Sequence, residues 1–266
     1  MSKTELQSRP LVILGAGYTG TFLYPLAKTH GWRTYATSRN PITHLPLVPE
    51  NDRIIFDLTA PKTWGNIPKN AHVIWCFPAL PQDAAVNFIE QHFEDRGRLI
   101  MLGSTSAYGS GQPSPVDEHA PLDYSIPRVQ SEEYLRETYG AVVLRLAGLY
   151  GPGRHVLDWM RKGKVNNTNK YVNLIHIEDV AAICLAALER AKAGEVYNVS
   201  DGISRQWSKI FEVASERWGL RLPPLSPPQN PGKRLTIAKL RSTLHSSFLH
   251  PDLYEALEEI EKQNNR

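Results

Sequence analysis

The sequence predicts an α/β fold, a doubly wound parallel sheet with a small C-terminal lobe. Three observations indicate it: short apolar runs alternate with helix-like segments, a glycine-rich turn follows the first run, and the alternation ends near residue 200. Helical crossovers make neighbouring strands parallel, and because such crossovers are right-handed, a doubly wound sheet is the simplest topology.

Short apolar runs are the expected strands of this sheet. In chain order they cover residues 11–14, 32–37, 53–56, 72–76, 98–102, 141–146 and 195–199. The helices expected between them cover about residues 18–30, 82–94, 128–138 and 178–190. Such alternation of strands with helices is typical of parallel α/β sheets.

The first strand runs directly into the turn Gly15-Ala16-Gly17-Tyr18-Thr19-Gly20, which is G-x-G-x-x-G between a strand and a helix. This context predicts a Rossmann-type dinucleotide site. Gly15 permits the tight turn, Gly17 lets the backbone approach a pyrophosphate, and Gly20 lets the helix pack on the strand. Tyr18 and Thr19 begin that helix, whose free N–H groups and positive end favour a phosphate.

The end of the second strand favours NADP(H) over NAD(H). A site selective for NAD usually offers Asp or Glu about 20 residues beyond the glycines, for the ribose 2′-hydroxyl. Here the strand ends in Thr37-Ser38-Arg39-Asn40, which contains no acid. Ser38 and Arg39 suit a 2′-phosphate, because a guanidinium donates several charge-assisted hydrogen bonds to phosphate oxygens. The alternative is that Arg39 is a solvated loop cation.

Two parts of the chain interrupt the alternation: residues 151–172, and the stretch after Gly202 with its Pro-rich connector. Such insertions gather at one end of the sheet, beyond the carboxyl ends of the strands, where ligands bind. We therefore expect a dinucleotide-binding domain and a small substrate-binding lobe. The first is expected at residues 9–150 plus about 173–200, and the second at about 151–172 plus 201–266.

Composition and charge are ordinary for a globular protein. Of 266 residues, 41% are hydrophobic, and the net charge is +3. This small charge, without basic residues clustered among aromatic ones, argues against a nucleic-acid partner. Without an apolar run of about 20 residues or an apolar leader, we expect a cytoplasmic chain that contacts no membrane. Cys76 and Cys184 have neither disulfide nor metal spacing, so no metal is expected.

Six segments, in order along the chain, resemble the short-chain dehydrogenase/reductase superfamily, in its extended branch of NAD(P)-dependent epimerases and dehydratases. Five of the six segments lie within about residues 10–200, which the resemblance covers, and the sixth follows later in the chain. The segments are the glycine turn, Asp57 after the third strand, residues 103–109 (GSTSAYG), 145–153 (RLAGLYGPG), 173–180 (NLIHIEDV) and 233–235 (KRL).

The chain departs from that family at two positions that matter. Extended members usually begin with G-x-x-G-x-x-G, and Leu14 stands where the first of those glycines would be. The family also uses a Tyr with a Lys four residues later, on the helix after the fifth strand. The matching element here is Tyr124-Ser125-Ile126-Pro127-Arg128. The chain therefore resembles the atypical subgroup, whose members often lack the Tyr/Lys pair.

By position, the resemblance implies Ser104, Tyr124 and Arg128 as catalytic residues. In the family, the tyrosine exchanges a proton with the substrate, and a nearby cation lowers its pKa. Arg128 supplies a fixed charge but not the compact contact of a lysine. Pro127 fits a first helical turn, so Tyr124 lies before the helix and is alternatively a surface or packing residue. Ser104 either bonds the substrate oxygen or caps its own turn.

The resemblance also implies contacts with the cofactor. Asp57 and Leu58 match the position that touches the adenine, where the acid accepts from the amino group. Phe77 and Pro78 follow the fourth strand and are expected beside the adenosine ribose and the diphosphate. Leu146, at the end of the sixth strand, is expected beside the nicotinamide.

Contacts with the substrate are expected from the loop after the fifth strand and from a later turn. Thr105, Ser106 and Tyr108 belong to that loop, and Arg154 follows the Tyr-Gly-Pro-Gly turn. Tyr108 alternatively packs beneath its loop, and Arg154 alternatively faces solvent. His176 has an architectural role in the family, where its segment ties a strand to the next helix.

Two functions of different classes remain open. The first is an NADP(H)-dependent oxidoreductase or epimerase-like enzyme that acts on a hydroxyl or carbonyl of a small metabolite, such as a sugar nucleotide. The alternative is an NADP(H)-binding sensor or assembly protein that has lost the Tyr/Lys pair. Charges on the helix at 128–138, including Glu132, Glu133, Arg136 and Glu137, make a monomer credible beside a homodimer.

Overall fold

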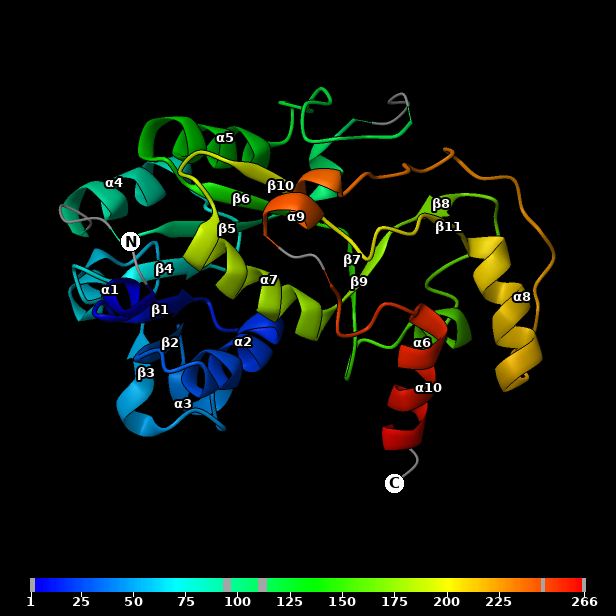
Figure 1. The fold of residues 1–266 in the computed structure, drawn as a ribbon, viewed down its shortest axis with the longest axis horizontal. Coiled ribbons are helices and arrows are strands. Elements are labelled where there is room, and N and C mark those ends of the chain that lie inside the picture. The colour runs from blue at the N-terminus through cyan, green and yellow to red at the C-terminus, as the bar shows by residue number, and fades with distance from the viewer. Residues whose placement is uncertain (1–2, 93–96, 110–113, 245–246, 265–266) are drawn as a thin grey trace.

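The computed structural model describes residues 3–92, 97–109, 114–244 and 247–264. Its centre is a parallel seven-stranded sheet in the order β10-β6-β5-β4-β1-β2-β3, which confirms the predicted doubly wound α/β fold (Figure 1). The strands of this sheet are β1 Leu11–Leu14, β2 Thr34–Ser38, β3 Arg53–Ile55, β4 His72–Trp75, β5 Leu99–Ser104, β6 Val142–Leu146 and β10 Val196–Val199.

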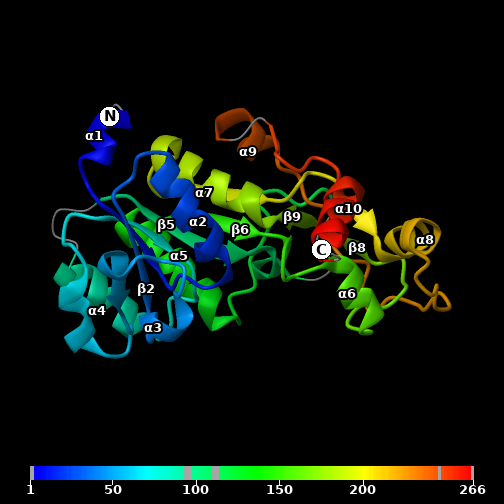
Figure 2. The same cartoon turned by 90° about the horizontal axis from the view of Figure 1, so that it is seen from below.

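Helices cover both faces of the sheet because its strands are apolar on both sides. Alternate residues of a strand face opposite sides. Leu11 and Ile13 belong to one apolar core, which includes residues of α2 (Tyr18–Thr29) and α7 (Ile177–Arg190). Val12 and Leu14 belong to a second core, with residues of α4 (Gln82–His92) and α5 (Pro127–Tyr139) (Figure 2).

Short helical turns connect the sheet and precede it. They are α1 Lys3–Gln7, α3 Pro41–His44 and the 3₁₀ turns η1 Glu50–Asp52, η2 Pro61–Asn66 and η3 Thr105–Ala107. Among the described residues, no helix is long and apolar enough to span a lipid bilayer.

A separate apolar core lies at the carboxyl end of the strands. It is formed mainly by α6, α8 and α10, which gather at one end of the molecule in both views (Figures 1 and 2). Two small ladders join this region to the sheet: β7 with β9 in parallel, and β8 with β11 antiparallel. The bounds are α6 Val156–Arg161, α8 Trp207–Trp218, α10 Leu253–Asn264, β7 Gly148–Tyr150, β8 Tyr171–Val172, β9 Leu174–His176 and β11 Arg205–Gln206.

The residues after 201, expected to belong to the small lobe alone, are divided between that lobe and the sheet. Helix α9 (Ala238–Thr243) follows the Pro-rich connector, and its residue Leu240 belongs to the core that includes residues of α2 and α7. Lys239 of α9 lies 4.9 Å from the ring centre of Tyr197 on β10. The chain after α8 therefore returns to the sheet before it forms α10.

Candidate functional site

The glycine turn lies where β1 meets α2, and its three glycines differ in their surroundings. Gly15 has φ +71°, and a Cβ there would lie 2.4 Å from Cδ1 of Phe77. A Cβ on Gly20 would lie 2.7 Å from Cβ of Ala16, so the helix approaches the strand closely. A Cβ on Gly17 would meet only the Gly15 carbonyl oxygen, at 4.0 Å. The amino end of α2 is therefore open to an incoming anion.

On one side of the glycine turn lies a cavity of about 440 Å³, called the Arg39 cavity below. The side chain of Arg39 is exposed and makes no hydrogen bond or ion pair with the described residues. The Ser38 hydroxyl bonds Nδ1 of His44 at 2.8 Å. Predicted site residues in the lining are Gly15, Gly17, Ser38, Arg39, Asp57, Leu58 and Phe77.

Asp57 lines the Arg39 cavity and is held there by Thr59. Its Oδ1 accepts hydrogen bonds from the backbone N–H of Thr59 at 2.9 Å and from the Thr59 hydroxyl at 2.8 Å. These bonds, with a smaller contribution from the charge of Arg39, lower the pKa of Asp57. Pro78 is exposed and is not part of the lining over the described residues.

On the other side of the turn lies a second cavity of about 390 Å³, called the Tyr18 cavity below. It shares Gly15 and Gly17 with the Arg39 cavity. The guanidinium of Arg154 lies 4.3 Å above the centre of the Tyr18 ring. The Tyr18 hydroxyl is buried and has no hydrogen-bond partner among the described residues, and burial raises the pKa of Tyr18 to about 12. Predicted residues in the lining are Gly15, Gly17, Tyr18, Thr19, Ser104, Leu146 and Arg154.

A chain of polar contacts leads from this cavity into α5. The Ser104 Oγ caps η3, accepting from the Ser106 backbone N–H and from the Ser106 hydroxyl, each at 3.1 Å. The Arg128 Nη2 donates to the Ser106 hydroxyl at 3.1 Å, and its Nη1 donates to Oε1 of Glu132 at 2.5 Å. Because the Ser104 oxygen accepts two bonds, its own proton is free for a group in the cavity.

Tyr124 lies apart from this chain of contacts. Helix α5 begins at Pro127, so Tyr124 precedes it, as Pro127 predicts. Its side chain is 53% exposed, and its carbonyl accepts from Nε2 of Gln130 at 2.6 Å. It does not line any of the cavities described for residues 3–92, 97–109, 114–244 and 247–264. The structure therefore brings Ser104 and Arg128 together but leaves Tyr124 outside.

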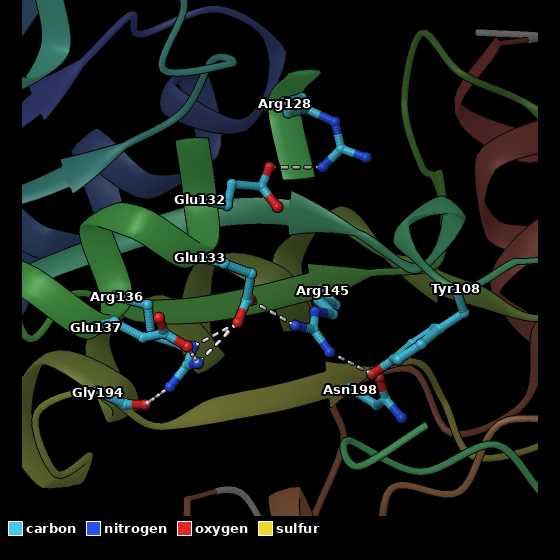
Figure 3. A network of polar contacts seen from close by, with 9 residues as sticks. All are labelled: Tyr108, Arg128, Glu132, Glu133, Arg136, Glu137, Arg145, Gly194 and Asn198. Atoms are coloured by element: carbon cyan, nitrogen blue, oxygen red, sulfur yellow. Dashed lines mark hydrogen bonds and ion pairs between the residues drawn. The ribbon is translucent and has the colours of Figure 1, made fainter. Parts of the chain in front are cut away.

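Tyr108 is held in the interior rather than in a cavity. Its side chain is 1% exposed, and its hydroxyl donates to Oδ1 of Asn198 at 2.6 Å. Arg145 donates to that hydroxyl at 3.0 Å and to Glu133 at 2.7 Å, as Figure 3 shows. This buried position does not fit the expected contact between Tyr108 and a substrate. It fits the alternative, in which Tyr108 packs beneath its loop, because the Tyr108 hydroxyl donates to Asn198 and accepts from Arg145.

Glu132 and Glu133, two of the charges on the helix expected at 128–138, are buried. Both face inward from α5, and they are 2% and 6% exposed. Glu132 pairs with Arg128, and Glu133 pairs with Arg145 and Arg136 (Figure 3). Burial raises the pKa of Glu132, and the charge of Arg128 opposes this. Sequence analysis missed Arg145 because it occupies a position in an otherwise apolar strand.

A third cavity, of about 410 Å³, continues from the Tyr18 cavity and is called the Lys233 cavity below. The two share Ser104, Leu146 and Ala147. Thr105 and Ser106, both predicted substrate contacts, line it on one side. The opposite side is formed by residues 170–173 and by Asn230, Gly232 and Lys233. The three cavities thus form one series past the glycine turn.

A further cavity, of about 580 Å³, lies at the opposite end of the strands, lined by Arg9, Arg98 and Arg190 among others. Two of these guanidinium groups are bound to backbone carbonyls: Arg98 donates to Ala191, and Arg190 to Leu244. Ligands of open α/β sheets bind beyond the carboxyl ends of the strands, and this cavity lies at the amino ends. We therefore place the candidate site at the glycine turn.

The rings of His176 and His250 lie in tilted contact at the amino end of α7, with ring centres 3.7 Å apart. His176 Nδ1 accepts from the Glu178 backbone N–H at 3.3 Å and so caps α7. His250 Nε2 bonds the Glu178 carboxylate at 2.7 Å. These three side chains are close enough to hold a metal ion in principle. In the structure, His250 Nε2 bonds Glu178 directly and His176 Nδ1 caps α7, so these atoms already serve the helix end.

Acidification is expected to destabilise the fold through His176. Burial, helped by the charge of His250, lowers the pKa of His176 from 6.5 to about 4. The unfolded chain therefore binds the proton more tightly, so stability is complete above pH 6.5 and falls as the pH drops towards 4. We expect a loss on the order of 2 kcal/mol.

Urea denaturation between pH 7.5 and 4.5 measures this loss. The matched variant is His176→Asn, because asparagine also caps helices but does not titrate. Its stability is expected to change less over that pH interval than the stability of the parent protein. Equal changes in both proteins would show that His176 is not the titrating group.

A family model described as "NAD dependent epimerase/dehydratase family" matches residues 11–200 of the chain. Protein YeeZ of Escherichia coli (strain K12) is 30% identical over 163 residues. That alignment covers 58% of this chain and 59% of YeeZ, so the chain matches only part of the length of this relative.

Solved structures of enzymes share the fold over nearly the whole chain. WbmG of Bordetella bronchiseptica, in complex with NAD, has a TM-score of 0.77 at 18% identity, covering 96% of this chain and 94% of WbmG. RMD of Pseudomonas aeruginosa, complexed with NADPH, has a TM-score of 0.70 at 18% identity, covering 96% of this chain and 98% of RMD. The predicted resemblance is confirmed by the family match, and the chain belongs to the NAD-dependent epimerase/dehydratase family.

Proposed function

We propose that the protein is an NADP(H)-dependent oxidoreductase or epimerase-like enzyme that acts on a hydroxyl or carbonyl of a small metabolite. The observation that carries this proposal is the series of three cavities. The Arg39 and Tyr18 cavities meet at Gly15 and Gly17, and the Tyr18 and Lys233 cavities meet at Ser104. An extended dinucleotide fits along the first two, and a small substrate fits in the third.

The preference for NADP(H) is supported by the charges at the Arg39 cavity. Arg39 is a cation with no hydrogen bond or ion pair to the described residues. One oxygen of Asp57, the acid in the lining, accepts two hydrogen bonds from Thr59. A 2′-phosphate would meet the available guanidinium of Arg39, which suits charge-assisted hydrogen bonds to phosphate oxygens. Solved relatives bind NADPH in one case and NAD in another, so the preference depends on these residues.

The chemistry proposed for this chain centres on Ser104. Its hydroxyl proton is free to bond a substrate oxygen, while Ser106 and Arg128 fix its orientation. The positive charge of Arg128 favours partial negative charge on that oxygen, transmitted through the Ser106 hydroxyl. A bound nicotinamide would supply or accept the hydride. Glu132 holds Arg128 in place and balances its charge.

A non-catalytic role is the second candidate, favoured by the position of Tyr124. A sensor or assembly protein needs the dinucleotide site but no proton donor, and Tyr124 is more than half exposed, outside the cavities. Spectrophotometric assay of NADPH oxidation with a panel of small aldehydes, ketones and imines separates the two. Turnover of any member supports the enzyme. Tight NADPH binding without oxidation across the panel supports the sensor.

Replacing Arg39 with Ala is expected to weaken NADPH binding roughly 10- to 100-fold, because one charge-assisted contact with the 2′-phosphate is lost. NADH affinity is expected to stay the same, since NADH lacks that phosphate. The measurement is a pair of fluorescence titrations on each protein. The matched control is Arg33→Ala, another arginine near β2, whose guanidinium instead bonds the Tyr35 hydroxyl. Equal losses for both dinucleotides would refute the assignment.

A further inference from the structure

The geometry points to an anion subsite in the Lys233 cavity: Lys170 and Lys233 bind a carboxylate or phosphate group of the substrate. The inference rests on the proposed function, because it concerns the substrate half of the same site. It assigns the substrate to a class, small acids or phosphate esters that carry the reacting hydroxyl or carbonyl near their anionic group.

Two segments far apart in sequence are fixed together to form this cavity. The Tyr171 backbone N–H donates to the carbonyl of Pro231 at 2.8 Å. Gly232 has φ +76°, and a Cβ there would lie 2.1 Å from the Tyr171 carbonyl oxygen, so only glycine permits the approach. Lys170 precedes this contact in one segment and Lys233 follows it in the other. The tight contact therefore sets both lysines at one cavity.

Lys233 is fixed beside the hydroxyl loop. Its Nζ donates to the carbonyl oxygen of Thr105 at 3.1 Å, and its other two N–H donors bond no group in the described part of the chain. Its own carbonyl accepts from Nδ2 of Asn173 at 2.8 Å. Thr105 adjoins Ser104 in the chain, and Ser104 and Lys233 line the same cavity, so one ligand could reach both. This spacing favours a small substrate.

The charges in the cavity are unbalanced. Over the described residues its lining includes two lysines and no acid. Neither Lys170 nor Lys233 forms an ion pair with the described part of the chain. Burial, together with the charge of Lys170, lowers the pKa of Lys233. A bound anion would relieve the repulsion between the two ammonium groups, and partial burial would strengthen its attraction to both.

Pyridoxal 5′-phosphate is the probe that tests the subsite. Its phosphate would bind one lysine while its aldehyde condenses with the deprotonated amine of the other, forming an imine and releasing water. Added borohydride then reduces the imine to a stable amine. No lysine lines the Arg39 or Tyr18 cavity among the described residues, so labelling there does not interfere. Peptide mapping identifies the labelled lysine.

We expect Lys233 or Lys170 to be labelled at least tenfold faster than other lysines, and pyridoxal without phosphate to react at least tenfold more slowly. Lys170→Met is expected to abolish the preference for Lys233, whereas Lys209→Met, which removes an exposed lysine paired with Glu212, leaves it unchanged. Protection by inorganic phosphate identifies a phosphate subsite, and protection by acetate identifies a carboxylate subsite.

Labelling spread evenly over the lysines, or unaffected by both anions, would overturn the inference. The labelling is done on the full chain without dinucleotide, and NADPH binding is measured separately on the same preparation. Failure of the anion subsite with intact NADPH binding leaves the proposed function standing. Specific, protected labelling in a protein that does not bind NADPH would support the anion subsite and refute the proposed function.

Discussion

Replacing Arg145 with Met is expected to lower the free energy of unfolding by about 3 kcal/mol. Arg145 is 2% exposed and donates to Glu133 and to the Tyr108 hydroxyl. Without it, a buried carboxylate loses its closest buried cation and the hydroxyl loses a donor. Arg136 still reaches Glu133, so the expected loss is at the lower end of the range for a broken buried pair.

Urea denaturation measures this loss, with Lys209→Met as a control in which methionine replaces a cation at an exposed site. The double variant Glu133→Gln/Arg145→Met is expected to recover part of the stability, because no unpaired buried charge remains. An Arg145→Met protein within about 0.5 kcal/mol of the parent would contradict the role of the network. Equal stabilities for the single and double variants would show that Glu133 is not the group left uncompensated.

Replacing Ser104 with Ala is expected to lower kcat about 100-fold for any carbonyl substrate that the panel identifies. The substrate oxygen would lose the hydrogen bond that strengthens as negative charge develops on it. The affinity for NADPH is expected to stay the same, because the proposed contact of the Ser104 hydroxyl is with the substrate oxygen. Steady-state kinetics and a fluorescence titration measure the two quantities on the same protein.

Ser106→Ala provides a graded comparison. Ser106 bonds the Ser104 oxygen and receives a bond from Arg128, so its loss is expected to cost about tenfold in kcat. Ser242→Ala, on the exposed face of α9, is the control. Full kcat in Ser104→Ala would remove Ser104 from the chemistry. Full kcat in Ser106→Ala alone would disprove the link from Arg128 while leaving Ser104 in place.

The local features of the dinucleotide half could be predicted from sequence because they depend on adjacent residues. The apolar run, Gly15 and Gly20 define a strand, a tight turn and a close helix within ten residues of chain. The break in helix before Pro127, which leaves Tyr124 outside α5, follows from proline geometry alone.

The inward direction of the Glu132 and Glu133 side chains on α5 could not be predicted from neighbouring residues. Glu132 and Glu133 are adjacent in a segment rich in charge, and charged residues usually face solvent. They are buried because Arg128 and Arg145 pair with them, and Arg145 comes from a different element. A charged residue in a buried strand, as at Arg145, is the signal that could have indicated this pairing.

The substrate half depends on contacts between distant parts of the chain. Lys170 and Lys233 meet only because Gly232 packs against Tyr171. Lys233 belongs to the matching segment at residues 233–235, but nothing in either local sequence indicates that Lys170 lies at the same cavity. Tyr108 shows the reverse: its place in the hydroxyl-rich loop suggested a substrate contact, yet its partners Asn198 and Arg145 come from other strands.

The central claim is that the glycine turn and Arg39 together bind a nicotinamide dinucleotide bearing a 2′-phosphate. Calorimetric titration of the protein with NADPH, and then with NADH, tests it most directly. We predict saturable binding of NADPH at one site per chain, and weaker binding of NADH. Heat from neither dinucleotide, with protein shown to be folded by its cooperative denaturation, would contradict the account.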